Sequence, residues 1–146
     1  MTRRKRAIDE HYIRKASDET VNDSSTYQND DDLKFAVGTN ETWLAIFVIR
    51  FTTGSTPDIK FQLSIPSGTS GGLFSGIALD GTTYASFFGS VAVRGPGGAE
   101  ATAVIHVTLR TSGTGGNAIL QWAQNTANAS DTKVLADSSL MAWRLD

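Results

Sequence analysis

Three consecutive aspartates form the densest group of candidate metal ligands in this 146-residue sequence. Asp30, Asp31 and Asp32 could offer oxygen ligands to Ca²⁺, because hard cations bind clustered carboxylates. Adjacent side chains point in different directions on an extended chain, however, and charge at a strand entrance usually stays in solvent and discourages edge-to-edge pairing. We therefore favour a solvated strand entrance and predict no metal site.

Catalytic groups of other kinds are sparse. The sequence has no cysteine and two histidines, His11 and His106, so no common nucleophilic triad has a local signature. The glycine-rich segments 68–72 and 113–116 lack the lysine and the strand-to-helix context of a phosphate-binding loop. A cell-wall hydrolase would need two carboxylates facing one cleft, and the sequence spacing indicates no such pair. We predict that the protein is not an enzyme and binds no cofactor.

Three tryptophans stand in strand-like segments: Trp43, Trp122 and Trp143. If they were exposed together, they could form an aromatic platform for a sugar ring. Tryptophans in strands are more often anchors of a core or of a subunit interface, because they bury a large apolar surface. We therefore predict core or interface positions for these three residues.

Charged side chains are concentrated and sorted at the start of the chain. The first 32 residues hold six of the thirteen basic residues and eight of the fifteen acidic ones, whereas residues 33–146 hold seven of each. Within residues 16–32 there are six carboxylates and no base. This sorting predicts a bipolar arm over residues 1–32 and a neutral domain over residues 33–146. The arm residues expected to bind a partner are Arg3, Arg4, Lys5, Arg6, Tyr12, Arg14 and Lys15.

The basic cluster from Arg3 to Arg6 could contact nucleic-acid phosphates. The calculated pI is about 5.6 and no aromatic residue is interleaved with the cluster, so an acidic patch on a neighbouring protein fits it better. The longest apolar run, from Trp43 to Ile49, has seven residues and is far short of the roughly 20 that span a bilayer. We expect a protein partner, with no nucleic acid and no membrane.

Beyond residue 32, apolar residues recur with a period of two, which is typical of half-buried strands. Turn residues separate these patterns, and Asp80-Gly81 suits a tight hairpin turn. We predict a jelly-roll-like β-sandwich of eight or nine strands, with a closed barrel as the alternative. The expected strands are 33–37, 42–51, 59–65, 73–79, 83–93, 103–110, 119–124, 133–136 and 139–145.

One expected strand, from Thr42 to Phe51, is apolar on both faces and should therefore lie in the middle of a sheet. One face begins at Trp43, and Leu44, Ile46 and Val48 form the other. This second face needs a cover, because contiguous exposed apolar patches are uncommon on monomeric proteins. Another strand layer or another subunit could supply that cover.

Three segments, taken in order, resemble small β-sandwich virion proteins of tailed bacteriophages. They are SSTYQNDDDLKFAVGTNETW from Ser24 to Trp43, TPDIKFQLSIPSG from Thr56 to Gly68, and LQWAQN followed by DTKVLADSSLMAWRL between Leu120 and Leu145. The same order of motifs recurs in capsid decoration proteins, head fibres and tail-associated proteins. The resemblance implies a structural protein of the virion.

We therefore expect a capsid decoration or head-fibre protein whose arm binds the major capsid protein or another virion subunit. Self-association, with a trimer favoured, would give several attachment points at once. A position on the capsid surface is favoured over the tail. The alternative is a receptor-binding or carbohydrate-binding module of a tail fibre, with loops Arg94 to Ala99 and Thr111 to Asn117 contacting the host.

Overall fold

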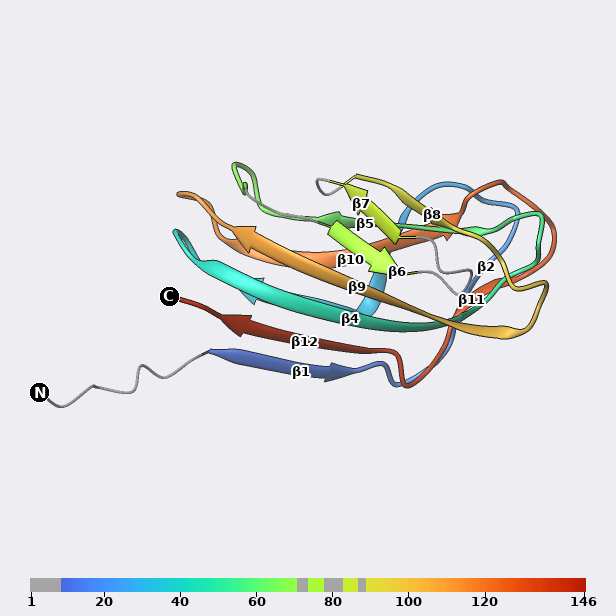
Figure 1. Cartoon of the computed structure of the whole chain (residues 1–146), viewed down its shortest axis with the longest axis horizontal. Coiled ribbons are helices and arrows are strands. Elements are labelled where there is room, and N and C mark those ends of the chain that lie inside the picture. The colour runs from blue at the N-terminus through green and yellow to red at the C-terminus, as the bar shows by residue number, and fades with distance from the viewer. Residues whose placement is uncertain (1–8, 71–73, 78–82, 87–88) are drawn as a thin grey trace, which may run out of the picture.

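The computed structural model describes residues 9–70, 74–77, 83–86 and 89–146, and this part of the chain is all-β (Figure 1). Its twelve strands form two sheets, which confirms the predicted β-sandwich. The strands are β1 Glu10–Arg14, β2 Glu19–Val21, β3 Gln28–Val37, β4 Thr42–Thr52, β5 Ile59–Ser64, β6 Phe74–Ile77, β7 Thr83–Ser86, β8 Val91–Val93, β9 Glu100–Arg110, β10 Gly116–Gln124, β11 Thr132–Val134 and β12 Ser139–Arg144.

The strand order is that of a jelly roll. The smaller sheet runs β3-β10-β5-β8, and the larger sheet contains β4-β9-β6-β7. Counted from β3, one sheet therefore holds the first, eighth, third and sixth strands, and the other holds the second, seventh, fourth and fifth. Further strands extend the larger sheet beyond β4: β12 and then β1 continue it, and β11 pairs with β4 and β2.

The longest pairing in the molecule joins β4 to β9, over eleven residues from Thr42 opposite Arg110 to Thr52 opposite Glu100. In both strands the residues alternate between buried and accessible, because successive side chains on a strand point to opposite faces. On its other side β4 pairs with β12 and β11. The prediction that Thr42 to Phe51 forms a central strand is confirmed.

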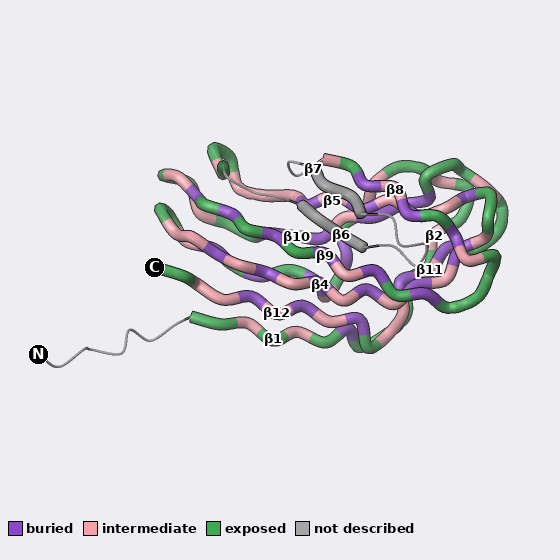
Figure 2. The backbone as a smooth tube through the Cα atoms, in the orientation of Figure 1, coloured by how far each residue is buried: buried purple, intermediate pink, exposed green. Residues whose placement is uncertain are grey.

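The hydrophobic core fills the space between the two sheets. It draws buried residues from both, including Phe47 and Phe51 of β4, Phe61 of β5 and Trp122 of β10, and the buried segments of Figure 2 follow these strands. The rings of Phe51 and Phe61 meet edge to face across the layers, with centroids 6.2 Å apart. Most of the inward positions are those that the period-two pattern predicts.

The expected strand from 83 to 93 is two strands in different sheets. Thr83–Ser86 (β7) pairs with β6 in the larger sheet, whereas Val91–Val93 (β8) pairs with β5 in the smaller one. A jelly roll moves the chain from one sheet to the other at this point, so a single continuous strand cannot form. The hairpin turn predicted at Asp80-Gly81 lies outside the described residues.

The predicted boundary between an arm and a domain at residue 32 is wrong for residues 9–32. Residues of β1 pair with β12, with Glu10 opposite Trp143 and Arg14 opposite Ser139. The short strand β2 pairs with β11, and β3 begins at Gln28 rather than at residue 33. These residues are therefore part of the sandwich, whose first strand begins at Glu10.

Truncating a core side chain should lower stability in proportion to the void that remains. Phe47 is fully buried, so we expect Phe47→Ala to lower the free energy of unfolding by about 3–5 kcal/mol in urea denaturation. Leu145→Ala is the matched control because Leu145 is 58% exposed, and it should change stability by less than about 0.5 kcal/mol. Equal effects of the two changes would contradict this account of the core.

Candidate interaction surfaces

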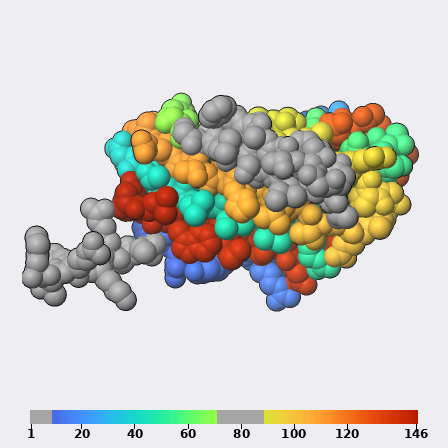
Figure 3. Space-filling view, in the orientation of Figure 1, coloured from blue at the N-terminus to red at the C-terminus, as the bar shows by residue number. Residues whose placement is uncertain are grey.

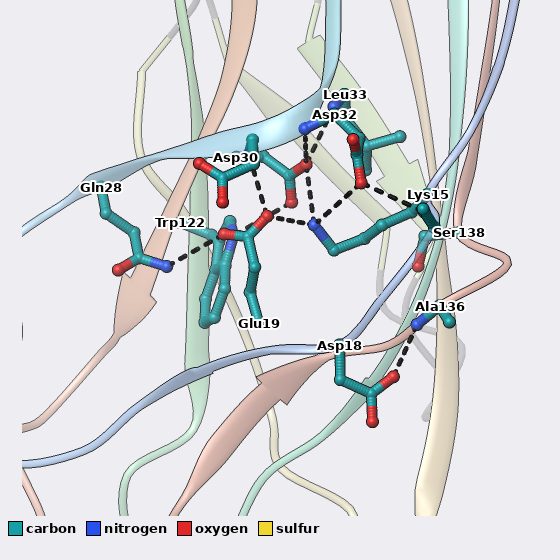
Figure 4. Close-up of polar contacts among 12 residues, drawn as sticks. Lys15, Asp18, Glu19, Gln28, Asp30, Asp32, Leu33, Trp122, Ala136 and Ser138 are labelled. Carbon is teal, nitrogen blue, oxygen red and sulfur yellow. Dashed lines mark hydrogen bonds and ion pairs between the residues drawn. The ribbon is translucent and has the colours of Figure 1, made fainter.

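A buried lysine joins residues 9–32 to the sandwich. Lys15 follows β1 directly, and its backbone exchanges hydrogen bonds with the loop before β12: its N–H donates to Ser138 at 2.7 Å, and its carbonyl accepts from Asp137 at 3.0 Å. Its side chain has no solvent exposure. The Nζ atom donates to Asp30 Oδ1 at 3.1 Å and to Glu19, which comes from β2 (Figure 4).

The carboxylate of Asp30 has a complete set of donors. Its Oδ1 atom accepts the backbone N–H groups of Asp32 at 3.0 Å and Leu33 at 2.8 Å, besides the ammonium of Lys15. Its Oδ2 atom accepts the indole N–H of Trp122, in β10, at 3.2 Å. Buried charges are stable only when they are paired and hydrogen-bonded in this way. One cluster therefore joins β2, β3 and β10 to the end of β1.

The expectation of a solvated strand entrance at Asp30–Asp32 is wrong for Asp30, which is completely buried. Asp31 is exposed, and Asp32 is half-buried with a carboxylate oxygen 3.9 Å from Lys15 Nζ. Adjacent residues on β3 point to opposite sides, so the three carboxylates do not converge. Among the described residues, no group of three or more His, Cys, Asp or Glu side chains is arranged to hold a metal ion.

The cluster shifts the pKa values of two members. Burial alone would lower the pKa of Lys15, but hydrogen bonding to Glu19 and the charge and hydrogen bond of Asp30 together outweigh it and raise that pKa above its ordinary value. Burial raises the pKa of Glu19 above its ordinary value, against the hydrogen bonds from Lys15 and from the backbone of Asp31. The lysine is therefore held in its charged form.

Lys15 is not available to a partner protein, contrary to the prediction that it belongs to a partner-binding arm. Part of the sorted charge has an internal explanation, because the base at position 15 pairs with carboxylates at positions 19, 30 and 32. Asp18 likewise accepts the backbone N–H of Ala136 at 2.8 Å. Within residues 9–32, the charge pattern therefore reflects pairing within the fold rather than an extended arm.

Removing the lysine should leave a buried, unpaired carboxylate. We expect Lys15→Met to lower the free energy of unfolding by about 3–5 kcal/mol near neutral pH, because it breaks a buried ion pair from one side. Urea denaturation measures this change. Lys34→Met, at an exposed position of β3, is the control and should stay within about 0.5 kcal/mol of the wild type. A loss no larger than that of the control would show that the buried pair contributes little.

The pH dependence of stability follows from the direction of the Lys15 shift. A raised pKa in the folded state gives a contribution that is complete below the ordinary value of 10.5 and is lost as the pH rises through the higher folded value. We expect the difference between the wild type and Lys15→Met to stay constant toward neutral pH and to shrink above about 10.5. Denaturation across alkaline pH measures it, and a constant difference there would contradict the assignment.

Two other residues predicted to bind a partner lie on the outer side of β1. Tyr12 is 63% exposed, and its ring meets that of Trp143 edge to face at 6.2 Å. Arg14 is exposed but pairs with Asp137 at 2.5 Å. Both are exposed on a strand of the sheet rather than on an extended arm, and their contact with a partner stays a prediction. Arg3, Arg4, Lys5 and Arg6 lie outside the described residues.

The three tryptophans occupy two kinds of position. Trp43 and Trp122 are buried in the core, at 2% and 0% exposure. Trp43 donates its indole N–H to Glu41 at 2.9 Å. Trp143 is half-buried and points outward from β12, because the inward positions of that strand are Leu140 and Ala142. Of the three, Trp143 alone is placed to contact another molecule, and they form no common platform.

The outer side of the larger sheet carries a continuous group of apolar side chains that we call the apolar face. On adjacent strands, Trp143 lies opposite Leu44 and Met141 lies opposite Ile46, while Val48 lies opposite Val104. All six side chains are half-buried. Figure 3 shows this side of the molecule, with atoms of β1, β12, β4 and β9 next to one another at the surface. The members of the apolar face are Leu44, Ile46, Val48, Val104, Met141 and Trp143.

The outer side of the smaller sheet is polar by contrast. Gln62 of β5 donates to Gln121 of β10 at 2.6 Å, and Gln121 donates to Asn29 of β3 at 2.7 Å. Lys60 of β5 lies over the ring of Tyr27 at 4.5 Å. This row of polar side chains is suited to water. The two outer surfaces of the sandwich therefore differ in chemistry, and the apolar one needs an explanation.

Ion pairs border the apolar face at both of its ends. At one end Asp137 contacts both Arg14 and Arg50, and Arg50 also pairs with Glu100 at 2.5 Å. At the other end Arg144 is shared among the carboxylates of Asp9, Glu41 and Asp146. The backbone N–H of Thr42, with a smaller effect of Arg144, holds the pKa of Asp146 below its ordinary value. Charges at the rim are paired, and the centre between them is uncharged.

A hollow of about 470 Å³ opens at the end of the sandwich where β1, β3 and β4 meet. Its walls include the ring of His11. The centroid of this ring lies 5.3 Å from the ring centroid of Trp43 and 5.8 Å from that of Phe35. The carboxylates of Asp9, Glu10 and Glu41 also line it. Trp43 and Phe35 are buried, so the half-buried ring of His11 is the aromatic surface that a sugar ring in this hollow could contact, with the carboxylates available to its hydroxyl groups. Of these carboxylates, Glu41 already accepts hydrogen bonds within the fold.

The two glycine-containing loops proposed for host contact lie at opposite ends of the sandwich. Residues 94–99 precede β9 and residues 111–115 follow it. Because β9 is eleven residues long, its ends are separated by about 36 Å at roughly 3.3 Å per residue. Figure 1 shows the loops at the two ends of the molecule. They cannot form one binding surface on a single chain.

No protein-family model and no curated protein matches the sequence. Similar solved structures include those of the Gx and Gt strains of infectious bursal disease virus, with TM-scores of 0.26 and 0.27 and sequence identities of 8% and 9%. These alignments cover 94% and 96% of this chain but 40% and 41% of the viral chains, so the chain spans about two fifths of their length. Scores this low support no inference about function. In the described part of the chain, no helix is long and apolar enough to cross a membrane.

Proposed function

We propose that this chain is a structural protein of a tailed-bacteriophage virion, and specifically a capsid decoration or head-fibre protein without enzymatic activity. The order of three sequence motifs supports the class, and a β-sandwich is the kind of fold that the resemblance implies. Jelly rolls also serve lectins and enzymes, so the fold alone does not select this function.

The observation that carries the proposal is the contrast between a satisfied interior and an apolar exterior. The buried charges of Lys15 and Asp30 are fully paired within the fold and have no group left to act on a substrate. The half-buried apolar residues on the outer side of the larger sheet are suited to contact with another protein surface. Such a molecule functions by packing against neighbours, which is the task of a virion subunit.

Attachment to the shell is assigned to the basic residues that precede β1. Arg3, Arg4, Lys5 and Arg6 lie a few residues before Glu10, the first residue of β1, and β1 is held in the sheet by β12. A basic segment fixed at one end to a folded domain can pair with an acidic patch of the major capsid protein. Several copies attached in this way would leave the shell only when all contacts release together.

Deleting residues 1–8 tests this attachment without removing any strand. Purified capsids that lack the protein are mixed with full-length or truncated chains, and occupancy is measured by cosedimentation and cryo-electron microscopy. We expect the full-length protein to occupy regular lattice positions and the truncated protein to lose most of its binding. The truncated protein should keep the thermal stability of the full-length chain.

A charge-only variant separates the effect of charge from that of length. Replacing Arg3, Arg4, Lys5 and Arg6 by Gln keeps the segment and removes its positive charge. Two results would support charge pairing: weak capsid binding by this variant, and wild-type binding that weakens as the salt concentration rises. Full occupancy by the truncated protein would refute attachment through these residues, and no occupancy by the full-length chain would refute the capsid assignment.

The second candidate is a carbohydrate-binding module of a tail fibre, and the hollow next to His11 and Trp43 favours it. The expected result under this alternative is binding of the full-length protein to a glycan array that is weakened by His11→Ala. Capsid binding without glycan binding would support the decoration role and contradict the carbohydrate-binding role. Glycan binding without capsid binding would support the carbohydrate-binding role instead.

A further inference from the structure

The apolar face differs from an ordinary exposed sheet surface in composition. Its central row places Met141 of β12, Ile46 of β4 and His106 of β9 side by side, with Tyr12 of β1 next to Met141. The neighbouring rows hold Trp143 beside Leu44 and Val48 beside Val104. An antiparallel sheet with one solvated side normally alternates apolar inside and polar outside. Here β4 is apolar on both sides although the core uses only one of them.

The central residues of the apolar face include no Lys, Arg, Asp or Glu. At its ends Arg14, Arg50 and Arg144 are paired with carboxylates, and Glu10, opposite Trp143, accepts a hydrogen bond from Tyr12. A polyanion or a strongly charged protein surface would find no complementary charge at the centre. A flat, uncharged, apolar sheet surface is complementary to another surface of the same kind. A second copy of this chain presents one, and two identical patches can cover each other about a two-fold axis or around a ring.

The area of the apolar face can be compared with that of a standard protein interface. Strands β4 and β9 are eleven residues long, or about 36 Å at roughly 3.3 Å per residue, and the four strands β1, β12, β4 and β9 span about 19 Å at roughly 4.8 Å each. Their product sets an upper limit of roughly 700 Å², compared with about 800 Å² per partner in a standard protein interface. This limit lies within the roughly 600 to 1,000 Å² per partner that standard interfaces bury, so a complex of two copies would use the rim as well as the apolar face.

We propose that the apolar face is the surface through which copies of this chain pack on one another, sheet against sheet. Facing sheets lie about 10 Å apart with strands crossing at about 30°, so side chains from β4, β12 and β9 would interdigitate. Trp143 and Tyr12 provide the aromatic anchors on one side of the face. The inference is independent of the capsid assignment, because it concerns contacts between identical chains in solution.

The test is the mass of the full-length protein in solution, measured by size-exclusion chromatography with light scattering at micromolar concentration. We expect a dimer or trimer for the wild type and a single chain of 15.6 kDa for Ile46→Glu, whose charge would lie at the centre of the face. Ile119→Glu is the matched control. Ile119 is also a half-buried isoleucine on an outward side of a strand, but it lies on the smaller sheet beside Lys34.

A second variant protects the test against misfolding. Met141→Lys changes a flexible outward side chain on the same row, and circular dichroism and thermal unfolding report whether each variant is folded. Folded, monomeric Ile46→Glu or Met141→Lys, with an oligomeric Ile119→Glu control, would support the proposal. A monomeric wild type, or oligomers that persist in both face variants, would overturn it. Capsid binding is measured in a separate experiment, so failure of the self-association proposal can be distinguished from failure of the capsid assignment.

Discussion

The buried ammonium of Lys15 is the constraint on which the arrangement of the N-terminal strands depends. An ammonium group without solvent contact is stable only if carboxylates reach it, and those of Glu19 and Asp30 do so from β2 and β3. Asp30 in turn needs donors on its remaining lone pairs, which the backbone at Leu33 and the indole of Trp122 supply. The position of each strand is therefore coupled to the others, and residues 9–32 cannot leave the sandwich without exposing a charge pair and losing a hydrogen bond of the core tryptophan.

The added strands also explain why the larger sheet has an apolar outer side. In the eight-strand jelly roll alone, β4 would be an edge strand of its sheet; β12, β11, β1 and β2 pair beyond it and make it central. A central strand can hold large apolar residues on both sides only if both sides are covered or shared with a partner. The polar row formed by Gln62, Gln121 and Asn29 shows that the other sheet of the same fold has a hydrophilic outer side. The difference between the sheets is thus specific to one surface.

The parts of the structure that depend on local alternation could be predicted from the sequence. The period-two patterns of β4, β5 and β9 identified the strands and their inward residues, because burial on one side of a sheet imposes that period. The prediction of an arm is wrong because Asp30, which pairs with Lys15, also accepts the indole N–H of Trp122, 92 positions away in sequence, and charge counting carries no information on such contacts. The tryptophans illustrate the same limit: the burial of Trp43 and the partial exposure of Trp143 depend on strand register, which spacing alone does not determine.

The pairing of β1 with β12 also determines how the molecule bears mechanical load. The two strands are antiparallel, and the chain enters β1 at Glu10, opposite Trp143 near the C-terminal end. Tension applied to the preceding residues along the strand direction would shear all five residue pairs of β1 at once instead of opening them one after another. Lys15 lies at the far end of the same strand, anchored in the interior, so β1 cannot slide without pulling a charge out of its cluster. In a subunit tethered through its first residues, β1 would therefore resist being pulled out of the sheet. This resistance would be greater to tension along the strand than to force perpendicular to it.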